Sequence, residues 1–503
     1  MSRLILAISG FLLTTIASGQ YCGTPQAPLL ERVDELNKSL PFTGRSAQKY
    51  IPVTFHLVAN SAGTGRVPEE DVLKQVAGLN NQYGDQMAVF YIDHFNYFDN
   101  DAVYNTPASA AAVTQMRLRK DNNSINVFIT NQAESGNETP GVVLAYFQPN
   151  EDWIVARRDR IGLTSSTLSH ELGHYFSLPH PFSGWDCHPY IETEYTNPVN
   201  VNFTIPCDNG SGSALIELQD GSNCLTAGDH ICDTPPDYNL GLLYQNGCAP
   251  NTKIKDKNNQ LITPIVNNFM SYYNDCANYS FTDMQKTLIN ASFFSSQRAY
   301  IRTGIVPNTT PVTGPVNYIS PINGISTPGI TDIVLDWEDT PGATNYMILL
   351  SKFASFTIEP LKYFSTESTV TIPVDLTEGR LYYWKVWPYN HSQTGAMYSA
   401  TQTFVAGGGV GVNEIKEING YSLNPNPARL NQEAILTITS IKSFDAEMKI
   451  TNASGQVMSS TSLQIPSGDS SHVINTSDFV PGIYFVMLHS AGGTLVERLL
   501  VSE

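Results

Sequence analysis

Between residues 46 and 180, apolar residues recur at the spacings of strands and helices. Every second residue from Ile51 to Leu57 is apolar, which predicts a strand with one buried face. Three acidic residues after Pro68 open a segment with one apolar face, which predicts a helix. That face is formed by Val72, Leu73, Val76, Leu79 and Tyr83. Further strands are predicted at 125–129 and 141–147, and a further helix at 166–177.

The pattern changes after residue 181. Residues 181–264 have little periodicity and are rich in Gly, Pro, Asn and Cys, so irregular structure held by disulfides is expected. A Pro- and Thr-rich segment at 306–316 and the Gly-rich segment 406–412 are typical of linkers. Short β-type runs follow each linker. The predicted fold class is therefore an α+β domain followed by two all-β sandwich modules.

The N-terminus has the composition of an export signal. Arg3 precedes an apolar run from Leu4 to Ile16 and then three small residues, so residues 1–19 are predicted to be a signal peptide. The run is shorter than the roughly 20 apolar residues of a membrane-spanning helix, and no later segment approaches that length. We therefore expect a secreted or cell-surface protein with no transmembrane segment.

Charge and cysteine content agree with an extracellular protein. The net charge of -18 and the pI near 4.9 exclude nucleic acid as a partner, because phosphate binding needs clustered Lys and Arg. Six cysteines crowd into one stretch and can form up to three disulfides, whose pairing the sequence leaves open. These are Cys187, Cys207, Cys224, Cys232, Cys248 and Cys276. The seventh, Cys22, stands alone and needs a separate explanation.

The segment "SHELGHYFSLPH" carries the predicted chemistry. On a helix, His170 and His174 project from one face, as a tetrahedral zinc site requires. Glu171 is placed to act as general base toward a water on the metal. His180 follows at the spacing of the longer motif H-E-x-x-H-x-x-G-x-x-H and is predicted as the third ligand. Ser177 replaces the glycine of that motif, so a strained left-handed turn is expected there.

A second element lies further along the chain, in "NNFMSYYNDC". Met270 resembles the Met-turn methionine found beneath the zinc of metzincins. In metzincins with a tyrosine at this place, the phenol stabilises the oxyanion of the tetrahedral intermediate, and the resemblance implies that role for Tyr272. The same part of the chain also contains the motifs "FHLV", "LNNQY" and "GDHICDTPPD" in addition to the zinc motif. Residues 46–305 resemble the pappalysin family of metzincin endopeptidases.

This resemblance implies further properties. An edge strand of the sheet would hold a protein or peptide substrate in extended form, and it corresponds to Leu144, Ala145, Tyr146 and Phe147. The family also binds calcium, which implies Asp229, Asp233 and Thr234 as ligands, although a solvated acidic loop is the alternative. Ser271 stands where family members often have an acidic residue, so a preference for basic residues after the scissile bond does not carry over.

Cys22 lies in "YCGT", before the catalytic domain. A thiolate is a strong zinc ligand and could occupy the position that water needs. Related bacterial enzymes resemble this, with a Cys-Gly pair in a short propeptide, so residues 20–45 are predicted to be a propeptide that is cut near 44–46. The alternative is a disordered mature N-terminus with an incidental thiol.

The two C-terminal modules resemble known domains. Residues 317–405, with "IVLDWEDTPGATNYMILLS" and "LYYWKVWPYN", resemble a fibronectin type III domain. Residues 413–503, with "NPNPA", "ITNASGQV" and "PGIYFVML", resemble the C-terminal sorting domain of type IX secretion substrates. This resemblance implies a Gram-negative bacterium of the Bacteroidetes kind and its secretion machinery as a partner; an ordinary terminal β-sandwich is the alternative.

The predicted function is a secreted zinc-dependent endopeptidase made as a latent zymogen. Two other classes remain open: a catalytically silent adhesin that uses residues 317–405 for contact, and a zinc hydrolase of non-peptide substrates. The intact Glu171 argues against the first, and the Met-turn argues for peptide over the second. Natural substrates, subsite preference and oligomeric state do not follow from the sequence.

Overall fold

The computed structural model describes most of the 503 residues in two compact units. The first unit comprises Met1–Thr313, Pro341–Thr344 and Tyr389–Met397, and the second comprises the rest of the chain. The described residues are 21–38, 48–86, 88–134, 143–186, 190–193, 196–199, 215–243, 248–249, 253–273, 276–358, 360–407, 415–490 and 492–502. The predicted signal peptide 1–19 and cleavage region 44–46 lie outside them.

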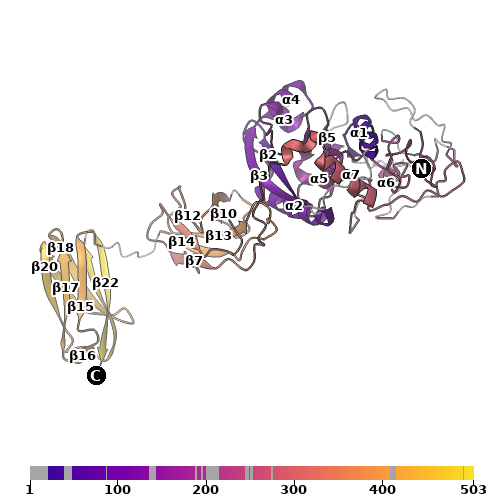
Figure 1. Cartoon of the computed structure of the whole chain (residues 1–503). Helices are drawn as coiled ribbons and strands as arrows, with labels where there is room; N and C mark the ends of the chain where they lie inside the picture. Colours follow the sequence, from indigo (N-terminus) through magenta and orange to yellow (C-terminus); the bar gives the residue numbers. More distant parts are fainter. Residues whose placement is uncertain are drawn as a thin grey trace, which may run out of the picture. The chain divides into compact units, whose positions relative to one another are not determined.

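A six-stranded sheet forms the centre of the first unit (Figure 1). Its strands, in spatial order, are β1 (Tyr21–Cys22), β5 (Val143–Gln148), β6 (Trp153–Arg157), β4 (Ile125–Thr130), β2 (Lys49–Ala59) and β3 (Ala88–Asp99). Strands β2, β3, β4 and β6 are mutually parallel, and β5 is antiparallel to β6. β1 adds to the outer side of β5 in parallel orientation. The strands predicted at 125–129 and 141–147 are confirmed as β4 and β5.

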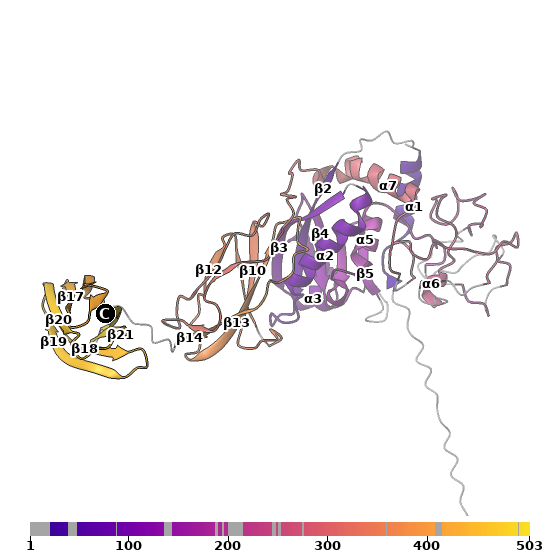
Figure 2. The same ribbon diagram turned by 90° about the horizontal axis from the view of Figure 1, so that it is seen from below.

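The prediction that the first strand has one buried face is wrong. Nearly every residue of β2 is buried, because β2 lies between β3 and β4 and helices cover both faces of the sheet. Helices α3 (Asp101–Asn105) and α4 (Ala110–Arg117) pack on one face with Val58, Phe128 and Val155. Helices α2 (Glu69–Gln82) and α5 (Thr167–Tyr175) contact β3, β5, β6 and each other (Figures 1 and 2).

The two predicted helices are confirmed as α2 and α5. Pro68 precedes α2 in an extended conformation and three acidic residues fill the first turn, where the helix dipole favours negative charge. The other helices were not predicted; among them, α1 (Ala27–Asn37) packs against α7 (Asp283–Phe294). Leu29, Val33 and Leu36 are the buried residues of α1. Strands β3 and β6 were also missed, because β3 has no clean alternation of buried and exposed residues and β6 is only five residues long.

The region after residue 181 is largely irregular, as predicted. The described part of 181–264 holds a single short α-helix, α6 (Leu240–Leu243). The disulfides Cys224–Cys232 and Cys248–Cys276 are formed, while Cys187 and Cys207 lie outside the described residues. Cys22 is free.

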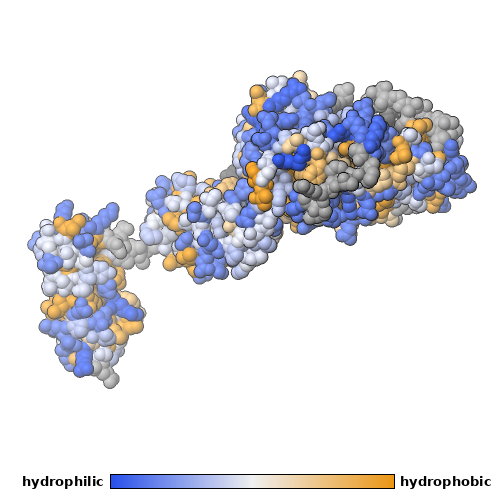
Figure 3. Space-filling model, in the orientation of Figure 1, coloured by the Kyte–Doolittle hydropathy of each residue, from blue (hydrophilic) through white to orange (hydrophobic). Residues whose placement is uncertain are grey.

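The second unit contains two pairs of packed sheets. The first pair orders its strands β11-β10-β13-β14-β8 and β12-β9-β7, and Trp337 of β9 packs near Trp384 of β13. The second pair orders its strands β15-β17-β20 and β16-β22-β21-β18-β19, and both sheets contribute to one apolar core. On the face seen in Figure 3, orange hydrophobic areas of this unit alternate with blue hydrophilic ones.

The strands of the first pair are β7 (Tyr318–Ser320), β8 (Ile325–Ser326), β9 (Val334–Trp337), β10 (Asn345–Ser351), β11 (Leu361–Ser365), β12 (Thr369–Thr371), β13 (Arg380–Tyr389) and β14 (Gln402–Ala406). Those of the second pair are β15 (Ile418–Asn424), β16 (Ala428–Arg429), β17 (Glu433–Ser440), β18 (Phe444–Asn452), β19 (Val457–Ile465), β20 (Gly468–Asn475), β21 (Gly482–Ser490) and β22 (Gly493–Ser502). Among the residues that the structure describes, no helix has the length and apolar character needed to cross a membrane.

Candidate active site

Helix α5 carries the first two predicted ligands and the predicted base. His170 and His174 lie one turn apart, so both imidazoles leave the same face of the helix. Glu171 follows His170 and is 1% exposed. A Cβ at Gly173 would lie 2.3 Å from the sulfur of Met270, so a side chain there has no room. The helix therefore packs directly on the predicted Met-turn methionine, which is fully buried.

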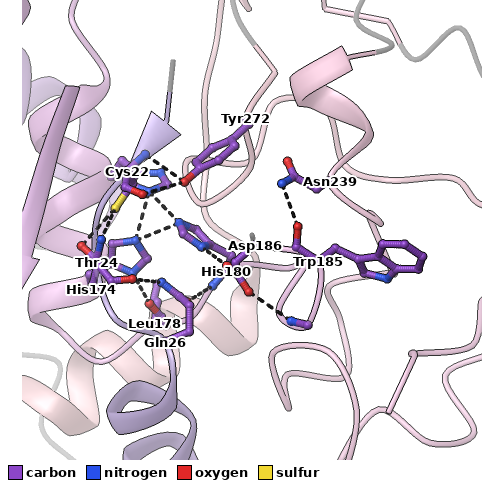
Figure 4. Close-up of polar contacts among 12 residues, drawn as sticks. Cys22, Thr24, Gln26, His174, Leu178, His180, Trp185, Asp186, Asn239 and Tyr272 are labelled. Atoms are coloured by element: carbon purple, nitrogen blue, oxygen red, sulfur yellow. Dashed lines mark hydrogen bonds and ion pairs between the residues drawn. The ribbon is translucent and has the colours of Figure 1, made fainter. Parts of the chain in front are cut away.

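His170, His174 and His180 meet at one point. Their Nε2 atoms are 3.0 Å apart for His170 and His174, and 3.1 Å apart for the other two pairs. The Sγ atom of Cys22 belongs to the same cluster, since one ligand atom from each of the four residues lies within 4.8 Å of the others. Figure 4 shows His174, His180, Cys22 and Tyr272 gathered at this place.

The other ring nitrogen of each histidine has an acceptor. Nδ1 of His170 donates to the carbonyl oxygen of Phe269, and Nδ1 of His174 donates to that of Leu178, both at 2.7 Å. Nδ1 of His180 donates to Oδ1 of Asp186 at 2.5 Å. A neutral imidazole with a proton on Nδ1 has a lone pair on Nε2, so three lone pairs face one another. Lone pairs at this spacing repel unless a cation lies between them. All three nitrogens can lie about 2.0 to 2.1 Å from one ion, so the residues fit zinc.

Burial sets the protonation of this cluster. It lowers the pKa of His170 to about 3, with a further contribution from the neighbouring imidazole of His180. Burial also lowers the pKa of His174 well below its usual value. The same burial raises the pKa of the Glu171 carboxyl to about 8 while the Cys22 thiol and the Thr24 hydroxyl contact it.

A left-handed turn at Ser177 brings the third histidine to the other two. Ser177 has a φ of 77°, as its place in the longer motif predicts. Its N–H donates to the carbonyl of His174, and the N–H of Leu178 donates to that of Gly173, which ends the helix. The hydroxyls of Ser177 and Ser292 are 3.1 Å apart, which offsets part of the strain.

Tyr272 lies beside the histidines. Its ring centroid is 5.9 Å from that of His170 and 5.1 Å from that of His180. Its hydroxyl accepts the N–H of Cys22 at 2.9 Å. Ser271, directly before it, donates to the buried carboxylate of Asp237. Helix α5, the turn 176–180 that follows it and residues 268–272 together form what we name the ligand scaffold.

Residues 21–26, which we name the covering segment, lie over this site. Tyr21 pairs with Val143 and Cys22 with Ala145, so the segment occupies the outer side of the predicted substrate strand. The Cys22 thiol lies 3.4 Å from Oε2 of Glu171. Burial, then the nearby carboxyl, raises the pKa of this thiol well above its usual value. Both predicted catalytic groups, Glu171 and the phenol of Tyr272, are thus in contact with Cys22.

The predicted calcium ligands do not all meet. The Thr234 hydroxyl donates to Asp229, at 2.9 and 2.8 Å from its two oxygens. Asp233 instead accepts from the Thr282 hydroxyl at 2.6 Å, at the N-terminus of α7. Glu217 lies beside Asp229, whose charge adds to burial in raising the pKa of Glu217 to about 10. Oε2 of Glu217 is buried and makes no hydrogen bond.

Four residues of the site were missed in the sequence. Asp186 orients the ring of His180, Thr24 and Gln26 belong to the covering segment, and Glu217 lies beside Asp229. Thr24 contacts Glu171, which is 147 positions away in sequence, so no local spacing could indicate it. Asp186 follows His180 by six positions, and a carboxylate soon after a ligand histidine was the one available signal.

Comparisons with known proteins identify the C-terminal module. Residues 422–502 match the family described as the secretion system C-terminal sorting domain, which confirms the sorting domain predicted at 413–503. No curated protein matches the chain. Among solved structures, the chain is similar to a promirolysin mutant from Tannerella forsythia at 17% identity and a TM-score of 0.36, with 56% of this chain and 97% of that chain covered. It is also similar to the chicken CNTN1 FN1–FN3 domains at 10% identity and a TM-score of 0.19, covering 39% of this chain and 66% of that chain. The chain therefore carries a C-terminal sorting domain of a secretion system.

Proposed function

We propose that this protein is a secreted zinc endopeptidase that is made as a latent zymogen. The observation that carries the proposal is the convergence of three Nδ1-protonated histidines whose free nitrogens are 3.0 to 3.1 Å apart, beside a buried carboxyl. Zinc in such a site acts as a Lewis acid and lowers the pKa of water.

Two side chains would assist the reaction, one by transferring a proton and the other by stabilising negative charge. Glu171 would take a proton from the attacking water and deliver it to the leaving amine, because it directly follows the ligand His170 on α5. Tyr272 would donate a hydrogen bond to the scissile carbonyl oxygen as negative charge develops on it, since the high pKa of its buried hydroxyl keeps it protonated.

Strand β5 would bind the substrate. Without β1, its outer side offers the backbone of Leu144, Ala145, Tyr146 and Phe147 to an extended peptide, which adds as a further strand. The presence of β1 on this side supports the assignment, because the chain's own segment already uses the strand in that way.

Latency would come from the covering segment. Cys22 is the fourth member of the ligand cluster, so its thiolate would complete a tetrahedral set with the three histidines. Removal of residues 20–45 would free both the metal and strand β5. The structure supports this proposal over an incidental thiol, because Cys22 contacts Glu171 and Tyr272.

Calcium would bind at Glu217, Asp229 and Thr234 as a structural ion. Burial raises the pKa of both carboxyls, and the charge of Asp229 raises that of Glu217 further, so a divalent cation between them would stabilise their ionised forms. Added calcium should raise the melting temperature of the full chain, whereas Glu217→Gln should remove most of that rise. An equal rise in both proteins would reject the site.

The C-terminal domains would deliver and place the enzyme. We assign the sorting domain to type IX secretion in a Bacteroidetes-type bacterium, and the sandwich at 317–405 to a fibronectin type III-like spacer or adhesion module. These assignments rest on the sequence resemblance and on the sorting-domain match.

One experiment separates the proposed peptidase from a silent adhesin and from a non-peptide hydrolase. Purified full chain, activated by limited proteolysis, is analysed for zinc and tested on a peptide library before and after chelation. We expect about one zinc ion and cleavage that chelation abolishes. Glu171→Gln should keep the zinc and lose about 1,000-fold in rate. A zinc-loaded, activated protein that cleaves no peptide would contradict the proposal.

A further inference from the structure

Thr24 joins two groups of the proposed active site through one hydroxyl. Its Oγ1 atom donates to Oε2 of Glu171 at 3.0 Å and accepts the backbone N–H of Phe147 at 2.8 Å. The Cys22 thiol is a third neighbour, at 3.0 Å. A hydroxyl has one hydrogen and two acceptor positions, so these three contacts satisfy it completely.

The backbone around Thr24 is held on both sides. Gly23 donates its N–H to the carbonyl of Ala145 at 3.1 Å. The Gln26 side chain donates to the carbonyl of Thr24 and accepts the N–H of His180, both at 2.9 Å. Thr24 is only 6% exposed. Its hydroxyl is therefore fixed between the catalytic carboxyl and the substrate strand, and water is excluded from both bonds.

From this geometry we propose that Thr24 is a second inhibitory contact, separate from Cys22, that needs no metal ion. It occupies the proton-accepting oxygen of Glu171 and the N–H of Phe147 that a substrate backbone would use. The inference rests on the proposed function, because that function gives those two groups their roles.

The two contacts differ in what holds them. The thiol of Cys22 binds the cluster strongly only when an ion is present, whereas the hydroxyl bonds of Thr24 form with or without one. The metal-free chain should therefore remain closed. Closure of the segment would precede zinc uptake, and the loss of zinc would not by itself release the segment.

The test measures how often the segment opens, using the full chain with zinc and after its removal by a chelator. Iodoacetamide alkylates Cys22 only in the open state, and peptide mapping by mass spectrometry reads that residue alone. Thr24→Val keeps the shape of the side chain and removes the hydroxyl. Since both buried hydrogen bonds of the Thr24 hydroxyl, to Glu171 and from Phe147, are then lost, we expect alkylation of the metal-free variant to be roughly 10- to 100-fold faster than in the unmodified chain.

Two further variants complete the design. Thr24→Ser keeps the hydroxyl and should alkylate at nearly the unmodified rate. Gln26→Ala loosens the backbone of Thr24 and should also accelerate alkylation. Hydrogen exchange at the Phe147 amide should quicken in Thr24→Val and not in Thr24→Ser.

A metal-free Thr24→Val that alkylates no faster than the unmodified chain would overturn the inference. An equal acceleration in Thr24→Ser would also overturn it, because the methyl group would then be responsible. No peptide is cleaved in this experiment. A failure of the proposed peptidase function would therefore appear in the cleavage assay and not here.

Discussion

The ligand scaffold and the covering segment meet at one site, but different kinds of bond hold them. In the scaffold, two of the three histidine rings donate to backbone carbonyls, and the rings are almost fully buried. The covering segment is held chiefly by the side chains of Cys22, Thr24 and Gln26, apart from the pairing of β1 with β5. Its attachment is thus a short set of separable contacts.

This difference fits the proposed roles. A site that must keep a metal through many reactions needs fixed acceptors for the Nδ1 protons of its histidines. The backbone carbonyls of a packed helix and turn are held in place in this way. The covering segment must be removed, so it is better held by a few contacts that all break when it detaches. Substitutions in the scaffold should therefore change zinc affinity or stability.

The largest effect is expected from removal of a ligand. His174→Ala should lower zinc affinity by more than the roughly 100-fold that loss of an outer partner causes. Alkylation of Cys22 in zinc-containing buffer should stay slow, because the hydroxyl bonds of Thr24 hold the segment without an ion. His489→Ala, at an exposed position of β21, is the matched control and should change neither quantity. Unchanged zinc affinity in His174→Ala would show that the three histidines are not the zinc site.

Removal of the Asp186 carboxylate should have the next largest effect. It fixes the ring of His180 by accepting from Nδ1, so Asp186→Ala should weaken zinc binding about 10- to 100-fold. Asp186→Asn keeps an acceptor oxygen, so its zinc affinity should lie between those of the unmodified chain and Asp186→Ala. Competition with a chromogenic chelator measures the affinity. If Asn and Ala weaken binding equally, the charge rather than the hydrogen bond orients the ring.

Gly173→Ala tests the packing under the ligands. Its new methyl group would meet the Met270 sulfur, so the variant should lose about 1 to 3 kcal/mol of unfolding free energy. Gly84→Ala, which meets no atom within 4 Å, should show no destabilisation. Urea unfolding of the metal-free chain gives both values. Equal stabilities would mean that the Met-turn does not support the helix.

Ser177 should give the smallest effect, with opposite signs for two variants. Ser177→Gly relieves the positive φ but loses the contact with Ser292, for a net gain of up to about 1 kcal/mol. Ser177→Ala keeps the strain and loses the contact, so it should destabilise. Thermal unfolding distinguishes them, and a destabilised glycine variant would show that the hydroxyl contact outweighs the strain.

The sequence predicted those parts of the site that depend on local spacing. His170, Glu171 and His174 share one helical face, and His180 follows at a fixed distance, so their meeting needs no knowledge of the fold. The left-handed turn at Ser177 also followed from its place in the motif. Helix α2 was predictable because its acidic first turn and its apolar face both lie within one short segment.

The features of the fold and of the site that were not predicted depend on contacts between distant segments. Nothing in the alternation of β2 reveals that helices cover both of its faces. Asp233 belongs to an acidic motif but lies at the N-terminus of α7, a helix that was not predicted. Thr24 belongs to the segment predicted as a propeptide, and only the fold brings it against Glu171.

X-ray absorption at the zinc edge of the intact full chain identifies the atoms that bind the metal. A zinc centre capped by the covering segment predicts three nitrogen neighbours at about 2.0 to 2.1 Å and one sulfur at about 2.3 Å. Cys22→Ser should lose the sulfur and keep the three nitrogens. A spectrum without three nitrogen neighbours, or one whose sulfur survives in Cys22→Ser, would contradict the account.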